Sequence, residues 1–250
     1  MPTESDLLTL VRDEEVFNDS TIFSDALLLR YFNEGALDMA HRFDAFIKTA
    51  TFNTVASTGE YILSGASPKI TSDDFLDFYW PAGGLIYNET SGVTTPMQDK
   101  MRSEKWLDEN FPDWQNATAS DTIIHATIGF DSSGNLVLKV YPKSSTATPQ
   151  FKVIYKARGT NMTLGTHYPW TGSTTNLLHT EPFQKALADY CLYKLYNKKA
   201  YMSEVAKSYL VSYLAIGEEL RMAQERVWRT EVVGLRSEGR VVARESFGSL

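Results

Sequence analysis

The sequence has little of what most enzymes and exported proteins need: it contains one cysteine and four histidines in 250 residues, and no long uninterrupted apolar run. A single cysteine cannot form an intramolecular disulfide or build a thiolate metal site alone, so a reducing compartment suits the chain best. Because a bilayer-length run and a basic, apolar leader after Met1 are also missing, we expect a soluble protein that is not exported by a signal peptide and does not contact a membrane.

Motifs of the common enzyme classes are missing too. The sequence has no GxGxxG, GxxxxGK[ST], GxSxG or HExxH pattern. The four histidines are His41, His125, His167 and His179. None stands at metal-ligand spacing from another, so we expect no metal and no cofactor. The acidic pairs 73–74 and 108–109 are interpreted as solvated charge, and an enzyme that uses scattered Asp and His residues is the weakest interpretation.

The charge balance argues against a nucleic-acid-binding protein. The chain carries 24 Lys and Arg against 31 Asp and Glu, which gives a formal net charge of -7 at pH 7. A molecule with this average field repels phosphate backbones. We therefore expect no non-specific binding of DNA or RNA.

The only cysteine, Cys191, lies in the stretch TEPFQKALADYCLYKLYN, residues 180–197. Steps of 100° along a helix place one set of residues on a single arc: Ala186, Leu187, Tyr190, Cys191 and Tyr193. A second set falls outside this arc: Gln184, Lys185, Ala188 and Asp189. Free cysteine commonly behaves as a small buried hydrophobic residue, so Cys191 is interpreted as core packing and not as a nucleophile.

Helical periodicity marks both ends of the chain. A short helix is expected over residues 5–12, and a longer one after Ser24, whose side chain can cap the first turn. Near the other end, Thr180 is the expected N-cap of a helix that ends at Asn197. A further helix follows, with a seam spaced by alternating gaps of four and three residues: Met202, Ala206, Tyr209, Tyr213, Ile216, Leu220 and Ala223. Such a seam favours antiparallel packing on the preceding helix.

The middle of the chain has the period of strands. TIIHATIGF, DSSGN and LVLKVYP, residues 122–142, predict a β-hairpin with a turn in the central group. Residues 151–157 predict another strand, and residues 60–63, 75–80 and 85–87 are weaker candidates. A short helix is expected near residues 97–110.

The last segment loses the helical period and contains three glycines, yet it is too apolar for a solvated tail. We interpret it as an arm that needs another surface. Its candidate contact residues are Arg229, Val232, Val233, Leu235, Arg236, Arg240, Val241, Val242, Arg244, Phe247 and Leu250.

These patterns together predict an α+β fold: an antiparallel helical bundle formed by both chain ends, with a large β-rich insertion and an extended C-terminal arm. The expected parts are the N-terminal helices at 1–49, the insertion at 50–178, the C-terminal helices at 179–228 and the arm at 229–250.

Three stretches resemble the head-to-tail adaptor, or connector ring, proteins of tailed bacteriophages. They are TLVRDEEVFNDSTIFSDALLLRYFNEGALDMAHRF, then KWLDENFPDWQN with NLVLKVYP, and EPFQKALADYCLYKLYN with the helix that follows. The likeness spans residues 5 to about 225. It implies a non-enzymatic virion protein at the head-tail junction, a dodecameric ring, and contact with the portal protein through the C-terminal segment.

We therefore expect a structural adaptor, made in the bacterial host cytoplasm, that joins the portal to a downstream tail or nozzle protein. The arm would add to the portal as an extended segment, and DNA would pass through an acidic channel during ejection without specific binding. The alternative is a carbohydrate- or receptor-binding tail component. Its stacking surfaces would be Tyr79, Trp80, Trp106 and Trp114.

Overall fold

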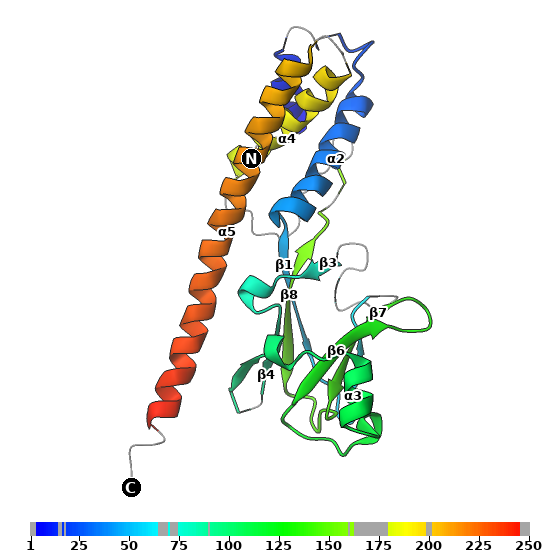
Figure 1. Cartoon of the computed structure of the whole chain (residues 1–250), viewed down its shortest axis with the longest axis vertical. Helices are drawn as coiled ribbons and strands as arrows, with labels where there is room; N and C mark the ends of the chain where they lie inside the picture. The colour runs from blue at the N-terminus through cyan, green and yellow to red at the C-terminus, as the bar shows by residue number, and fades with distance from the viewer. Residues whose placement is uncertain are drawn as a thin grey trace. The chain divides into compact units, whose positions relative to one another are not determined.

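The computed structural model describes residues 4–14, 17, 19–64, 70, 75–89, 91–159, 161–162, 180–198 and 202–245; for 4–6, 180–181 and 228–245 it describes the backbone alone. The chain divides into two compact units (Figure 1). The first comprises Met1–Lys48 with Lys156–Arg226, and the second comprises Thr49–Tyr155 with Val227–Leu250.

The first unit contains α1 (Glu4–Arg12), α2 (Asp25–Phe43), α4 (Thr180–Asn197) and the first part of α5 (Ser203–Glu245). The predicted cap of α2 is confirmed, because the side chain of Ser24 accepts a hydrogen bond from the amide of Leu27. At the other end of α2, Asp44 adopts a left-handed conformation, and its backbone N–H donates a hydrogen bond to the carbonyl oxygen of Met39. Local capping thus fixes the length of α2.

Helix α4 is the central helix of this unit. It contacts both α1 and α2, and it is buried on more than one side. The two helices α2 and α4 pack tightly at Gly35, where an added Cβ would lie 2.8 Å from Cδ1 of Tyr190. Buried rings such as Phe46 and Phe183, with centroids 5.3 Å apart, fill the remaining space. A helix covered by several neighbours needs apolar or paired residues on nearly every side.

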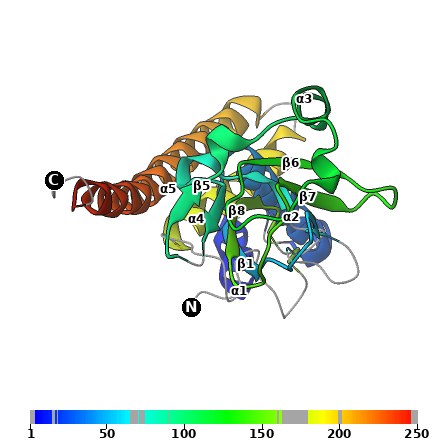
Figure 2. The ribbon, with the colours of Figure 1, turned by 90° about the horizontal axis from the view of Figure 1, so that it is seen from below.

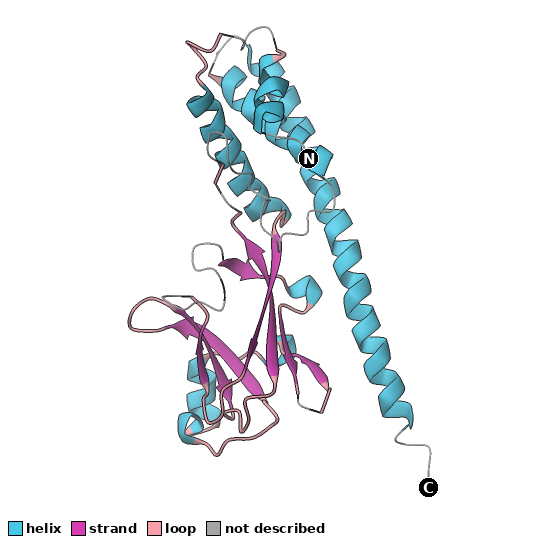
Figure 3. Cartoon of the chain, turned by 180° about the vertical axis from the view of Figure 1, so that it is seen from behind, coloured by secondary structure: helices cyan, strands magenta, loops and turns pink. Residues whose placement is uncertain are grey.

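Strands of the second unit and its borders form two sheets (Figure 3). The larger runs in the order β1 (Ile47–Asn53), β8 (Gln150–Ala157), β4 (Leu85–Asn88) and β5 (Thr94–Pro96), with β3 (Phe75–Phe78) also paired to β8. The smaller runs β2 (Glu60–Ile62), β7 (Leu136–Tyr141) and β6 (His125–Phe130), all antiparallel. The predicted hairpin is confirmed as β6 and β7, in register from His125 opposite Tyr141 to Phe130 opposite Leu136.

The two sheets share an aromatic core. The rings of Phe52, Tyr61 and Phe151 lie with centroids 5.5 to 5.7 Å apart, and Tyr87 adds a fourth ring 5.0 Å from Phe151. Because Tyr61 belongs to the smaller sheet and the other three belong to the larger, these rings hold one sheet against the other. Burial of large aromatic area is the main source of stability expected here.

The short helix α3 (Glu104–Asn110) lies against the smaller sheet (Figure 2). Ser103 caps it by accepting from the amide of Trp106. Glu104 then forms an ion pair of 2.7 Å with Lys139 on β7. On the neighbouring strand, a Cβ at Gly129 would lie only 3.2 Å from the same carboxylate. The 3-10 helix η4 (Trp114–Asn116) follows, and its Trp114 indole nitrogen donates to Oδ1 of Asp108 on α3.

The predicted fold class is wrong. The described residues form a mixed α+β structure with two sheets and five α-helices, and they show no antiparallel bundle made from both chain ends, since Val227–Leu250 belongs to the second unit. The predicted extended arm is helical as far as Glu245, because α5 continues through Gly234 and Gly239. A glycine inside a helix costs only about 1 kcal/mol relative to alanine, which a long helix tolerates.

Candidate interaction site

Three carboxylates hold the first part of helix α5 in place. Tyr209 Oη donates to Oε1 of Glu14 at 2.7 Å. Ser212 Oγ donates to Oδ2 of Asp189 on α4 at 2.6 Å, and Tyr213 Oη donates to Oδ2 of an α2 aspartate, Asp38, at 2.6 Å. Because the three acceptors belong to three different segments, these bonds fix the position of α5 along its axis.

Electrostatics in this seam favour the protonated hydroxyls. Burial raises the pKa of Tyr213 far above its usual value, and the hydrogen bond to Asp38 raises it further. The pKa of Tyr209 is raised in the same way, first by burial and then by the hydrogen bond to Glu14. Burial also raises the pKa of Asp189, against the opposing effect of the Ser212 hydroxyl. The Tyr209 and Tyr213 hydroxyls therefore keep their protons and remain hydrogen-bond donors.

Close backbone contact supplements these hydrogen bonds. A Cβ built at Gly217 would lie 2.4 Å from Cε2 of Phe43, so only glycine lets α5 pass the end of α2 at this distance. About two turns further, the side-chain amide of Gln224 donates to the carbonyl oxygen of Ala45 at 3.0 Å. The predicted seam agrees with this packing, since Ala206, Tyr213 and Leu220 are buried.

The acids of this site were not found from the sequence. The helical projection placed Asp189 and Gln184 outside the buried arc of α4, but they are only 6% and 8% exposed. That projection assumes one buried face, whereas α4 is covered on several. One signal was available: the α5 seam contains hydroxyl groups at Tyr209 and Tyr213, and buried hydroxyls require hydrogen-bond partners.

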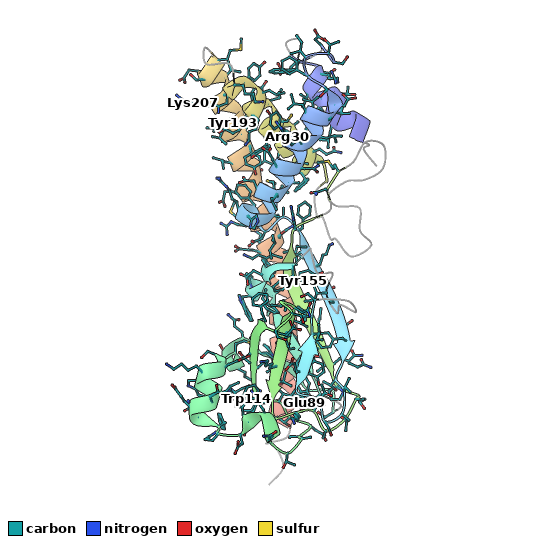
Figure 4. The ribbon with its side chains drawn as sticks, turned by 90° about the vertical axis from the view of Figure 1, so that its right-hand side faces the viewer. Arg30, Glu89, Trp114, Tyr155, Tyr193 and Lys207 are labelled. Carbon is teal, nitrogen blue, oxygen red and sulfur yellow. The ribbon has the colours of Figure 1, made fainter. Side chains whose placement is uncertain are left out.

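The outer side of α5 carries apolar residues. Val211 is 65% exposed and Met222 is 44% exposed. They are eleven residues apart, which is about three helical turns, so they lie within roughly 20° of each other around the helix. Tyr193 of α4 and Lys207 of α5 mark this part of the unit in Figure 4. Exposed apolar residues that share one side of a helix are suited to contact with a further helix.

The predicted arm residues remain a prediction. The side chains of Arg229, Val232, Val233, Leu235, Arg236, Arg240, Val241, Val242 and Arg244 lie outside the described residues, as do Phe247 and Leu250 entirely. Only the backbone of residues 229–245 is described, and it is helical. The prediction that this segment is an extended strand is therefore wrong: its described backbone is helical.

Cys191 has the environment of a core residue, as predicted. It is fully buried, and burial raises the pKa of its thiol far above the usual range. A thiol held in this way is a poor nucleophile, because the thiolate is the reactive form.

The two histidines that the structure describes lie in different settings. His41 is exposed at the end of α2, whereas His125 packs its ring 5.1 Å from that of Trp106. Burial lowers the pKa of His125, which favours the neutral ring. His167 and His179 lie outside the described residues. Within the described part of the chain, no group of His, Cys, Asp or Glu could hold a metal ion.

The four aromatic residues of the alternative interpretation do not form one exposed platform. Tyr79 is fully buried and Trp114 is 5% exposed, whereas Trp80 and Trp106 are partly exposed. Asp108, interpreted as solvated charge, is exposed and also accepts a hydrogen bond of 2.8 Å from the Trp114 indole. Asp73 and Asp74 lie outside the described residues.

Comparison with known families decides the identity of the chain. The sequence model of the SU10 adaptor protein family matches residues 2–236. The chain belongs to the SU10 adaptor protein family. The match covers both units and α5 as far as residue 236, so it includes the hydrogen-bonded seam described above. No curated protein matches the sequence.

Membership of this family confirms the predicted resemblance to phage adaptors. An SU10 adaptor is a structural protein of a bacteriophage, which agrees with a place in the virion and with tail assembly. Over the residues that the structure describes, no helix has both the length and the apolarity needed to cross a bilayer.

Proposed function

We propose that copies of this chain form a ring at the head-tail junction, joining the portal to a downstream tail or nozzle protein and surrounding the channel through which DNA passes during ejection. The observation that carries this proposal is the family match over residues 2–236. A firmly held α5 supports it, because a connector must transmit force without changing its own packing. We expect the ring to be dodecameric.

Contacts between neighbouring copies would use the outer side of α5. Val211 and Met222 are exposed apolar residues on one side of a helix whose other side is fixed to its own unit. A charge at Val211 would then prevent assembly while leaving the fold intact, since this side chain is largely in solvent. Mass photometry and negative-stain images of Val211→Glu test this contact, with Val205→Glu as the control, because Val205 is also exposed but lies about 120° away around the same helix. Normal rings from Val211→Glu would contradict it.

Contact with the portal would use residues 229–250. Val232, Leu235 and Val242 are spaced by three and seven positions, and residues with this spacing recur on one side of a helix. We propose that this segment docks on the portal as a helix in a groove, with arginines pairing with acidic groups of the portal.

Deletion of residues 229–250 tests portal docking. The three carboxylate bonds of α5 lie before this segment, so the truncated protein should still fold, with a helical circular dichroism signal that falls only by the contribution of residues 229–245. It should fail to join portal-containing particles in sedimentation. A second variant, Val232→Ser with Leu235→Ser and Val242→Ser, keeps the chain length. Normal attachment of both variants would refute docking through this segment.

An acidic channel would let DNA move without sticking, because the net charge of -7 per chain opposes phosphate. Assembled rings should therefore show no affinity for duplex DNA at physiological salt. Fluorescence anisotropy of a labelled duplex measures this, and a micromolar or tighter complex would contradict the proposal.

A further inference from the structure

The second unit contains a polar pocket that the proposed function does not use. It is a cavity of about 430 Å³ beside Trp114, which is labelled in Figure 4. Its walls come from residues 57–60, from the end of β7 and Lys143, and from η4. The polar side chains that line it are Ser57, Thr58, Glu60, Gln115, Asn116, Lys139 and Lys143. This volume lies within the range of about 300–1,000 Å³ that is typical of small-molecule sites.

Two of the larger lining groups are fixed by α3. The Trp114 indole nitrogen donates to Oδ1 of Asp108 at 2.8 Å, and Lys139 Nζ lies 2.7 Å from Oε1 of Glu104. Both partners belong to the same short helix, which packs on this sheet. The pocket wall is thus preorganised, which lowers the cost of ordering it around a ligand.

The other polar side chains of the pocket are available. Within the described part of the chain, Glu60, Gln115, Asn116 and Lys143 form no side-chain hydrogen bond or ion pair. They offer both donors and acceptors toward one cavity. Ser57, at the same rim, has a φ of 60°, a left-handed conformation that costs energy in a residue other than glycine. Asp113, which directly precedes Trp114, has a φ of 64°. Strained residues of this kind gather at binding sites.

Charge balance limits the class of ligand. The ion pair with Glu104 offsets the charge of Lys139, and the other two charged lining residues, Glu60 and Lys143, are of opposite sign. A phosphate or nucleic acid would therefore meet no excess of positive charge. A purely apolar ligand would desolvate several polar groups without returning hydrogen bonds. The described residues provide no metal-binding cluster here.

A neutral molecule rich in hydroxyl groups satisfies all of these conditions. Its hydroxyls can donate to Glu60 and accept from Lys143, while the amides of Gln115 and Asn116 can do either. The small exposed part of Trp114 supplies a limited apolar surface for the C–H face of a ring. We propose that this pocket binds a short neutral saccharide. This pocket is not the exposed set of aromatic side chains that the sequence suggested as a carbohydrate-binding surface. The proposed binding does not depend on assembly of subunits into a ring or on the portal.

Direct binding to the full-length protein tests the proposal. The probes are glucose, galactose, mannose, N-acetylglucosamine and their common disaccharides, observed by saturation-transfer NMR and isothermal titration. At least one should bind with a dissociation constant near 1 mM or below, which corresponds to about -4 kcal/mol. Glucose 6-phosphate and sialyllactose, as anionic probes, should bind no more tightly than their neutral counterparts.

A matched pair of variants locates the site. Gln115→Ala removes an exposed glutamine from η4, and Gln98→Ala removes an exposed glutamine from another 3-10 helix, η3 (Gln98–Lys100), which does not line the pocket. Gln115→Ala and Asn116→Ala should weaken binding at least about tenfold, and Gln98→Ala should not change it. Trp114 is left unchanged, because its burial makes loss of fold the expected result.

Three results would overturn this inference. The first is that no neutral saccharide of the panel binds. The second is that Gln98→Ala and Gln115→Ala weaken saccharide binding equally. The third is that the anionic probes bind more tightly than the neutral ones and that this preference disappears in Lys143→Gln. Ring assembly, measured on the same samples by mass photometry, reports separately on the proposed adaptor function.

Discussion

Replacing Gly217 by alanine should destabilise the first unit, although the same change in an exposed helix is favourable. Alanine exceeds glycine in helix propensity by about 1 kcal/mol. Here the new methyl group would lie 2.4 to 2.6 Å from three ring atoms of Phe43. That ring is 3% exposed and packs edge-on to Tyr213 with centroids 5.8 Å apart, so it has little space to move. Overpacking of this kind costs about 1–3 kcal/mol or more.

Because all three close atoms belong to one rigid ring, we expect a cost at the upper end of that range and a net loss of about 2 kcal/mol in the free energy of unfolding. Guanidinium denaturation followed by circular dichroism at 222 nm measures it. The matched control is Gly35→Ala, whose Cβ meets Tyr190 at 2.8 Å and should cost less.

A double-mutant cycle separates the clash from helix propensity. Phe43→Ala removes the ring, so in that background Gly217→Ala should stabilise the protein by up to about 1 kcal/mol. The reasoning would be refuted if Gly217→Ala alone were as stable as the wild type, or if its effect did not change sign when Phe43 is absent.

Three further predictions concern the buried polar groups. Tyr213→Phe should lower the free energy of unfolding by about 1.5–3 kcal/mol at pH 7, because it removes a hydrogen bond to the charged Asp38. Since the folded-state pKa of Tyr213 is raised, its contribution is complete below the unfolded pKa of about 10 and declines above it, so Tyr213→Phe should lose less stability between pH 9 and 11 than the wild type. Asp189→Asn keeps an acceptor for Ser212 and removes a buried charge, so denaturation at pH 7 should show equal or greater stability; a large loss would contradict this. Cys191 should react with a thiol reagent only after unfolding, and rapid labelling of the native protein would count against its burial.

The sequence predicted most local elements because each is set by short-range chemistry. Ser24 is a typical N-cap residue and so predicts the start of a helix. The turn from Asp131 to Asn135 is also local: Oδ1 of Asp131 accepts hydrogen bonds of 2.8 Å from the backbone amides of Ser133 and Asn135. The alternation on either side of this turn then specifies β6 and β7. None of these steps requires knowledge of distant residues.

Features that depend on distant contacts were not predicted. Asp189 is polar and fell outside the apolar arc of α4, yet its partner Ser212 lies 23 residues away on a helix that covers that side. The C-terminal part of α5 was read as extended because Gly234 and Gly239 interrupt the apolar pattern. Helix continuation through these positions follows from the length of the helix that precedes them, since propagation is favourable once a helix exists.

The polar character of the α5 seam has a consequence for how the adaptor would work. A purely apolar seam allows a helix to slide by one turn, because one buried side chain can replace another. Carboxylates on three different segments, Glu14, Asp38 and Asp189, accept hydrogen bonds from α5, and a shift of α5 by one turn would break all three bonds. Arg42 and Tyr196 would still contact Asp38 and Glu14, but Asp189, which is only 6% exposed, would lose the Ser212 hydroxyl. Leaving even one buried charge without its partner costs several kcal/mol. A load applied to the C-terminal part of α5, as expected if that part docks on the portal, would therefore move the first unit as one body instead of pulling the helix out of it.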